Sequence, residues 1–254
     1  MVFLSNVELD VPKQTVLRPA SEFALRYNCS AVVVPPELIT NACIARAMAR
    51  SRHKVIAAID CPKGNQFMAD KFRGVPSESL NCDGFEIMLT PTGNVDIKRE
   101  VKFLSQFLRD HFPPSVEIRF VLGYYTPGHT QEQNENMLRA MSLVPAPAMV
   151  RTTCLTKIPN VEGTPAAQKD LIDQIFKICH VPLKLSGNVD LEILDACRDA
   201  KKFGCTIEQA QIIAKDQAKK ESDQAQAQAS PPPASLSLSL GTSVIPAPTS
   251  QEAK

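Results

Sequence analysis

Two apolar runs, Ala31-Val32-Val33-Val34 and Val55-Ile56-Ala57-Ala58-Ile59, decide the fold class. Neither run alternates polar with apolar residues, as a strand does when one of its faces meets water. A continuously apolar strand is instead typical of a parallel sheet, because helices cover one face and a barrel interior or further helices cover the other. The two runs therefore predict parallel strands in an α/β protein.

Similar apolar runs recur along the chain roughly every 20 to 35 residues, which is the spacing of strand–helix units. We predict eight strands: Val7–Val11, Ser30–Val34, Val55–Ile59, Gly84–Leu89, Glu117–Leu122, Ala148–Thr153, Pro182–Ser186 and Lys201–Thr206. Eight parallel strands that alternate with helices make a (β/α)8 barrel, or TIM barrel. The predicted fold class is therefore α/β, with one TIM barrel in residues 1–222.

Amphipathic segments lie between the predicted strands. In the clearest one, Asp96–Phe112, apolar residues such as Val101, Leu104 and Leu108 recur at three- and four-residue spacings, as on the buried face of a helix. Pro113-Pro114 then ends this helix, because proline cannot continue it. The other predicted helices are Glu37–Arg50, Thr130–Leu143, Thr164–Cys179, Leu191–Lys201 and a last one that ends near Lys220.

Residues 223–254 differ in composition from the rest of the chain. They are rich in Ala, Gln, Ser and Pro, so we predict a C-terminal tail outside the barrel. Within the tail, Leu236–Leu240 alternates leucine with serine, which would place three leucines on one face of an extended strand. The segment 235–245 is then either part of a disordered end or a strand that pairs with the sheet edge of a protein partner.

Composition argues against several classes of partner. The chain has 28 basic and 27 acidic residues, a formal net charge of +1, so no long-range field selects nucleic acid or anionic lipid. No apolar stretch reaches the roughly 20 residues of a membrane-spanning helix, and the first residues lack the regions of a secretory signal. Eight cysteines without a CxxC pair are typical of free thiols in a reducing compartment. We therefore expect a cytoplasmic protein that binds no nucleic acid and no membrane.

Functional groups in such barrels project from the carboxyl ends of the strands and from the loops that follow. Four of these positions carry short motifs: Leu9-Asp10, Ala31–Pro36, Pro62-Lys63-Gly64 and Asp83–Leu89. In this order they resemble the deoxyribose-phosphate aldolase family, whose motifs are hydrophobic-Asp, Val-Cys-Val-x-Pro, Pro-x-Gly and Asp-Glu-Ile-Asp-Met-Val. The resemblance implies a carbon–carbon lyase that acts on a small phosphorylated sugar or aldehyde without a cofactor.

The resemblance also implies a catalytic set. The family forms a Schiff base on a lysine of the sixth strand, assisted by a second lysine on the seventh strand and an acidic residue on the fourth. Arg151 stands in the first of these positions, Lys184 in the second and Glu86 in the third, with Asp10 on the first strand. A guanidinium stays protonated, so Arg151 cannot form the imine. The usual nucleophile is therefore missing from its place.

Substrate binding, by the same resemblance, falls on residues near the ends of the last three strands. These are Thr153, Ser186, Gly187, Gly204 and Thr206. Asn188 replaces the second glycine expected after the seventh strand, and Glu208 stands in the loop after the eighth. Glycines let backbone N–H groups approach a phosphate, whereas a nearby carboxylate repels it. We therefore expect a weakened phosphate site.

Other titratable residues give less specific signals. Asp10, Asp60 and Glu86 share the active face, but their separation in sequence shows no ligand spacing, so no metal site is predicted. His53 and His111 fall at the ends of predicted elements, where solvated surface is expected. His129, in the loop after the fifth strand, is the one histidine expected at the active face.

Three roles for Lys184 remain open: a structural partner of Glu86, a nucleophile whose free amine the charge of Arg151 favours, or a binding group for an anionic ligand. Two functions follow from them. The chain is either a lyase that uses Lys184, or an inactive aldolase-like barrel that serves as a structural or interaction subunit, in a homo-oligomer or larger assembly, with the tail as its attachment. The fold alone cannot choose between them.

Overall fold

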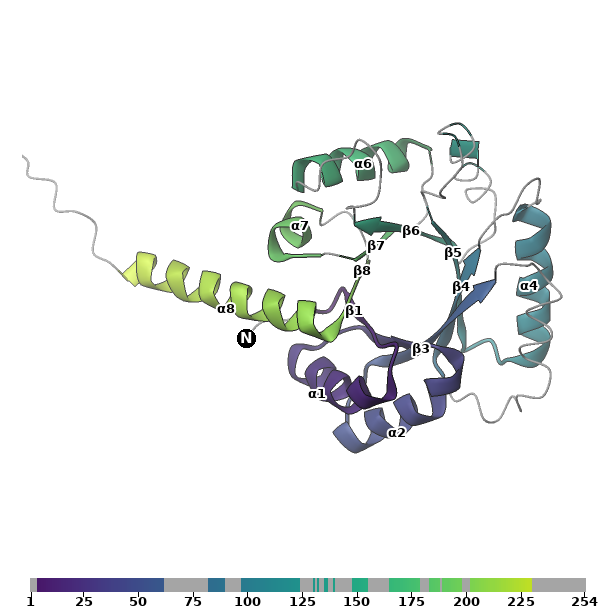
Figure 1. Ribbon diagram of the computed structural model, residues 1–254, viewed down its shortest axis with the longest axis horizontal. Coiled ribbons are helices and arrows are strands. Elements are labelled where there is room, and N and C mark those ends of the chain that lie inside the picture. Colours follow the sequence, from purple (N-terminus) through teal and green to yellow (C-terminus); the bar gives the residue numbers. More distant parts are fainter. Residues whose placement is uncertain are drawn as a thin grey trace, which may run out of the picture. The chain divides into compact units, whose positions relative to one another are not determined.

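The computed structural model describes residues 4–61, 82–89, 97–123, 148–154, 165–178, 183–187, 189–197 and 202–229, together with residues 130, 132, 135, 136 and 139. Eight parallel strands pair in sequence order, and the first pairs with the eighth to close the barrel (Figure 1). The strands are β1 (Val7–Asp10), β2 (Ala31–Val34), β3 (Lys54–Cys61), β4 (Gly84–Leu89), β5 (Glu117–Gly123), β6 (Ala148–Cys154), β7 (Leu183–Gly187) and β8 (Lys202–Cys205). The predicted TIM barrel is therefore confirmed, and every predicted strand forms.

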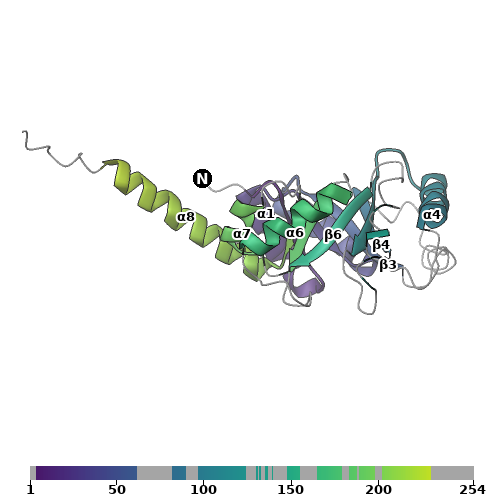
Figure 2. The same cartoon turned by 90° about the horizontal axis from the view of Figure 1, so that it is seen from above.

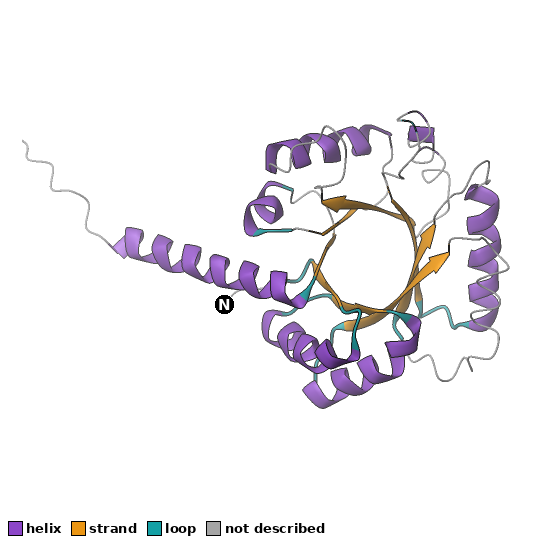
Figure 3. Ribbon diagram, viewed as in Figure 1, coloured by secondary structure: helices purple, strands orange, loops and turns teal. Residues whose placement is uncertain are grey.

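Helices lie outside the ring of strands (Figure 3). They are η1 (Gln14–Val16), α1 (Leu17–Tyr27), η2 (Pro36–Leu38), α2 (Ile39–Ala49), α4 (Ile97–His111), α6 (Pro165–Ile178), α7 (Leu191–Ala196) and α8 (Ile207–Ala229). Helix α4 lies outside β4 in both views (Figures 1 and 2), and Phe112 at its end packs on Phe85 of β4 with ring centroids 4.6 Å apart.

Three helices differ from the prediction, and one of them, α7, ends at Ala196 instead of Lys201. Helix α1 was not predicted from the sequence, although Pro19 lies in its first turn, where a helix tolerates proline. The prediction that the last helix ends near Lys220 was wrong, because α8 continues to Ala229 through residues that favour helix, such as Ala and Gln. The predicted helix Thr130–Leu143 lies largely outside the described residues, and so does the segment 235–245.

The chain divides into two units, residues 1–219 and 220–254, and the barrel lies in the first. The domain boundary at residue 222 stays a prediction. No helix within the described ranges is long and apolar enough to cross a membrane.

Side chains alternate between the two sides of the barrel wall. Outward residues such as Leu9, Val32 and Phe85 belong to the main apolar core, which they share with residues of the surrounding helices. Inward residues Ala31, Val33 and Ile56 of β2 and β3 form a separate small cluster. The barrel interior is therefore apolar on the side of these two strands.

The strand register shows that charged residues on other strands also point into the barrel interior. Glu8 pairs with Ala31 on one side and with Gly204 on the other. Glu86 pairs with Arg119, and Lys184 pairs with Lys202. Because paired residues on neighbouring parallel strands point to the same side of the sheet, these charged residues face one interior.

Candidate functional site

Lys184 of β7 lies at the centre of the barrel interior, and its side chain is 0% exposed. Its Nζ atom donates to Glu86 Oε2 at 2.9 Å and lies 3.0 Å from Glu8 Oε2 and 3.7 Å from Asp10 Oδ1. Three of the four predicted catalytic residues, Lys184, Glu86 and Asp10, are therefore brought together. The pairing of Lys184 with Glu86 is one of the three arrangements that the sequence left open.

Glu8 of β1 is a member of this cluster that sequence reasoning missed. Its buried carboxylate lies between Lys184, Arg119 at 2.7 Å and Lys202 at 3.4 Å. Burial raises the pKa of Glu8, but the charges of Lys184, Arg119 and Lys202 outweigh it and lower the pKa to about 2. Glu8 is thus ionised near neutral pH. Its position two residues before Asp10, on the same face of the strand, was the available signal.

Arg119 of β5 is the second missed member. It donates through Nη1 to Glu8 Oε1 at 2.7 Å and through Nε to Glu117 Oε1 at 2.6 Å, and Nη1 lies 4.0 Å from Glu86 Oε2. Burial lowers the pKa of Arg119, but Glu8 and Glu117 raise it above its usual value. Glu117 in turn accepts from Lys54 at 2.8 Å, so the ion pairs continue from the interior to the surface. We call Glu8, Asp10, Glu86, Glu117, Lys54, Arg119, Lys184 and Lys202 the interior network.

The interior network fixes the chemistry available to Lys184. An amine attacks a carbonyl only in its uncharged form. Carboxylates within ion-pair distance favour the charged ammonium, whereas burial opposes it. With Glu8 ionised at 3.0 Å and Glu86 bonded at 2.9 Å, the geometry is that of an ammonium ion held by carboxylates.

Arg151 belongs to β6, and its Cα is paired with that of Lys184, so the register puts the two side by side along the sheet. Thr153 is paired in the same way with Ser186. The side chains of Arg151 and Thr153, and that of Asp60 on β3, lie outside the part of the chain that the structure describes.

Gly204 of β8 is required by the packing of Lys184. A Cβ atom at this position would lie 2.8 Å from Lys184 Cε, 3.0 Å from Asp10 Oδ2 and 3.3 Å from Ser186 Cβ. The first contact is shorter than real Cβ atoms show and the other two are tighter than most, so the neighbours would have to move. The glycine therefore leaves room for the lysine side chain. Ser186 is buried beside it, and Gly187 ends β7.

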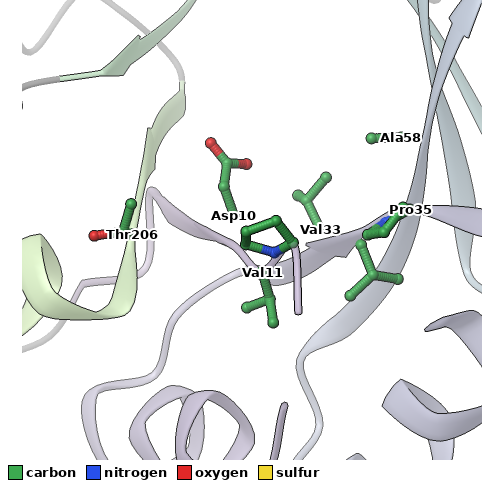
Figure 4. A pocket seen from close by; sticks show the side chains of 8 residues that line it. Asp10, Val11, Val33, Pro35, Ala58 and Thr206 are labelled. Atoms are coloured by element: carbon green, nitrogen blue, oxygen red, sulfur yellow. The ribbon is translucent and has the colours of Figure 1, made fainter. Parts of the chain in front are cut away.

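A cavity of about 350 Å³ opens at the carboxyl ends of β1, β2, β3 and β8. Its described lining consists of Asp10, Val11, Pro12, Val33, Val34, Pro35, Ala58 and Thr206. In the view of Figure 4 the Asp10 carboxylate stands between Thr206 and Val33. Asp10 is 29% exposed and lies 3.7 Å from the buried Lys184, so it connects this mouth pocket to the interior network.

The loop after β8 is closed by its own side chains. Thr206 Oγ1 accepts from the backbone N–H of Gln209 at 3.4 Å, and Gln209 Oε1 accepts from the N–H of Thr206 at 2.9 Å. This reciprocal pair is a capping box at the start of α8. Hydrogen bonds from the backbone N–H of Glu208 and from Thr206 lower the pKa of Glu208. The start of α8 thus carries its own acceptor groups and a carboxylate, which disfavours phosphate.

The prediction that His53 is a solvated surface residue was wrong, since His53 is only 5% exposed. Burial lowers the pKa of His53 to about 4, and the charge of Arg46 adds to this effect. His111 is exposed, as predicted, and His129 lies outside the described residues. No group of three or more potential metal ligands occurs among the residues that the structure describes.

Comparisons with known proteins agree with the barrel. QR15, an aldolase, superposes with a TM-score of 0.62 at 16% identity over 87% of this chain and 97% of that one. Deoxyribose phosphate aldolase from Aeropyrum pernix, a tetramer, gives a TM-score of 0.62 at 14% identity over 85% of this chain and 91% of the aldolase. The chain has the fold of the deoxyribose-phosphate aldolases.

That likeness extends to other TIM barrels. Orotidine 5'-monophosphate decarboxylase from Methanocaldococcus jannaschii superposes with a TM-score of 0.51 at 16% identity over 85% of this chain and 96% of the enzyme. No family model and no curated protein sequence matches the chain. The comparisons therefore establish the fold, and the function has to be argued from the site.

Proposed function

We propose that this chain is a catalytically silent aldolase-like barrel that acts as a structural or interaction subunit. The observation that carries the proposal is the environment of Lys184, whose fully buried Nζ lies within 3.7 Å of three carboxylates. A nucleophilic lysine needs a free amine and a path for the carbonyl substrate. Lys184 is instead fully buried, and the carboxylates around its Nζ atom favour the ammonium form.

Arg151 supports the same conclusion. The resemblance to the aldolase family places it where the Schiff-base lysine is expected, and its backbone is registered with Lys184. A guanidinium cannot take over the nucleophile's role. In this proposal Lys184, Glu86, Asp10 and Arg151 are structural residues of the barrel interior.

Borohydride trapping tests the proposal. The full chain is incubated with a panel of aldehydes and sodium borohydride, and adducts are counted by intact mass and located by peptide mapping. We expect labelling spread over surface lysines, with the same adduct count in Lys184→Met as in the unmodified chain. An active deoxyribose-phosphate aldolase treated in parallel shows that the conditions trap a Schiff base.

A selective adduct on Lys184 would overturn the proposal. It would favour the second candidate function, a carbon–carbon lyase on small sugars or aldehydes. The observation in favour of a lyase is the mouth pocket, because Asp10 lines it and contacts Lys184. In that case Thr153, Ser186, Gly187, Gly204 and Thr206 would be the substrate-binding residues, and Asp10 and Glu86 would move protons.

The lyase hypothesis is tested by an activity assay. Cleavage of deoxyribose 5-phosphate at an ordinary enzymatic rate, on the order of 10 per second, would establish it. The capping box at the start of α8 and Glu208 disfavour a phosphorylated substrate. If any cleavage occurs, we therefore expect it with deoxyribose in preference to its phosphate.

The subunit role includes assembly. The Aeropyrum pernix aldolase is described as tetrameric, and we propose that this chain also self-associates or joins a larger assembly, with residues 235–245 contacting a protein partner. Light scattering of the full chain and of a chain ending at residue 223 tests both parts. A cytoplasmic location belongs to the same proposal, supported by the free thiols of Cys29, Cys43, Cys82, Cys197 and Cys205.

A further inference from the structure

A second pocket lies at the amino ends of the strands, at the end of the barrel opposite the mouth pocket. It has a volume of about 380 Å³ and is formed by residues just before β1, by the turn between α1 and β2, and by the turn between α2 and β3. Its polar lining includes Ser5, Asn28, Ser30 and Ser51. This volume is within the range of small-molecule sites.

The charges that line this pocket are all positive. Arg50, Arg52 and Lys54 contribute to its wall, and no carboxylate does among the described lining residues. Lys54 is compensated by Glu117 at 2.8 Å. Neither Arg50 nor Arg52 makes an ion pair within the described part of the chain, so these two guanidinium groups carry the uncompensated charge.

An arginine near a helix end often only offsets the helix dipole, and Arg50 follows the last turn of α2. That explanation does not account for Arg52, which lies two residues beyond the C-cap Arg50 and lines the same pocket. His53 is buried, its Nδ1 lies 2.7 Å from Ser51 Oγ, and its Nε2 has no hydrogen-bond partner among the described residues. The Nε2 atom is closed to solvent, so a ligand in the pocket does not reach it, and His53 is a buried neighbour of the pocket wall.

We propose that this pocket, lined by Arg50, Arg52, His53, Ser51 and Asn28, binds a small molecule that carries a phosphate group. Guanidinium groups match the geometry of phosphate oxygens. The side chains of Ser51 and Asn28 on the same wall add neutral hydrogen-bond donors for phosphate oxygens. A polyanion such as nucleic acid fits less well, because the formal net charge of +1 provides no field to attract it.

The proposal is independent of the proposed function, because none of the residues that line the pocket contacts Lys184 in the described ion pairs. It adds a binding site to the end of the barrel where the aldolase resemblance predicts none. The proposed site is the same whether or not Lys184 is catalytically active.

Titration of the full chain with inorganic phosphate tests the site, with calorimetry for affinity and the ¹⁵N-resolved imidazole signals of His53 as the local readout. We expect saturable binding to one site and a shift of the His53 imidazole signals, because the bound charge lies beside the buried ring. Arg52→Gln and Arg50→Asn should each weaken binding about tenfold or more, since each removes a charge-assisted hydrogen bond. Asparagine suits position 50 because the residue there has a φ of 54°.

The matched control is Arg18→Gln, which removes an arginine that is 70% exposed, pairs with Glu22 on α1 and does not line the pocket. It should bind phosphate as the unmodified chain does. Equal weakening by all three substitutions, or saturation without a change at His53, would overturn the proposal. An oligonucleotide that binds through Arg50 and Arg52 while phosphate does not would assign the surface to nucleic acid instead.

Discussion

The mouth pocket at the carboxyl ends of the strands has Asp10 as the charged residue of its described lining, whereas the pocket at the amino ends is lined by Arg50, Arg52 and Lys54. The resemblance to the aldolase family implies a phosphate site at the carboxyl ends of the strands. Among the described residues, the carboxyl end has Asp10 in its pocket and a capped helix N-terminus, while the pocket at the amino end is lined by cations. The described linings of the two pockets therefore differ in the sign of their charge, and function must be argued from these side chains.

Between the two pockets, the interior network determines what the barrel can do. Its buried members are paired, because a buried charge without a partner is strongly unfavourable. A network of this kind is costly to break and is difficult to use for chemistry that needs an uncharged amine. Substitutions at the two ends and in the interior separate their contributions.

The largest expected effect follows from removing the central cation. Lys184→Met leaves Glu8 and Glu86 buried with one fewer partner, and we expect a loss of about 3–5 kcal/mol in the free energy of unfolding. Urea denaturation at neutral pH measures it. The control is Lys54→Met, which breaks a partly exposed pair with Glu117 and should cost about 1 kcal/mol or less. Similar losses in the two variants would contradict the special place given to Lys184.

The pH dependence of stability separates the amino end from the interior. Folding lowers the pKa of His53 from 6.5 to about 4, mainly through burial, so the unfolded chain binds the extra proton and stability falls between pH 6.5 and 4. Folding lowers the pKa of Glu8 from 4.5 to about 2, where neighbouring cations outweigh burial, so a second loss follows between pH 4.5 and 2. Each contributes about 3 kcal/mol.

Urea unfolding at a series of pH values tests both windows. His53→Gln should flatten the dependence from pH 6.5 to 4, and Glu8→Gln should flatten it below pH 4.5 while also lowering stability at neutral pH. If His53→Gln leaves the upper window unchanged, the assignment of that window to the amino-end pocket is wrong.

Much of the fold could be predicted because each strand is recognisable from its own short stretch of sequence. Runs such as Ala31–Val34 and Val55–Ile59 are apolar on both faces, and this pattern can be seen in a single sequence. Helix α1 was not predicted, although its first-turn proline is compatible with a helix, and the end of α8 was missed because an Ala- and Gln-rich composition was interpreted as a tail. For α8, composition outweighed helix propensity in the interpretation.

The candidate site was harder to predict. Lys184, Glu86 and Asp10 were found through resemblance, but Glu8 and Arg119 were not, because their meeting depends on the register around a closed barrel. They are separated by 111 residues in sequence. His53 was misjudged for a related reason, since its burial depends on packing against segments that a single sequence does not bring together.

A smaller effect is expected at Gly204, next to the interior network. In Gly204→Ala the new methyl group would lie 2.8 Å from Lys184 Cε, and we expect a loss of about 1–3 kcal/mol in the free energy of unfolding. Chemical denaturation of a double-mutant cycle with Lys184→Ala measures the coupling. The cost should shrink when the lysine side chain is gone. An equal cost in both backgrounds would mean that Gly204 is needed for the backbone and not for Lys184.

The smallest effect concerns the cap that closes the mouth of the barrel. Thr206→Ala removes the hydroxyl that accepts from Gln209 N–H, and loss of an N-cap costs about 1 kcal/mol, measurable as a shift of the urea midpoint. The cap accounts for only part of what disfavours phosphate at the mouth pocket. The variant should therefore still bind phosphate only at the opposite pocket, through Arg50 and Arg52. The His53 signals report this binding. The matched control is Thr40→Ala within α2, away from both pockets. A second phosphate site that appears in Thr206→Ala would show that the hydroxyl alone blocks an intact aldolase-like phosphate site, and the contrast between the two ends would then rest on one side chain.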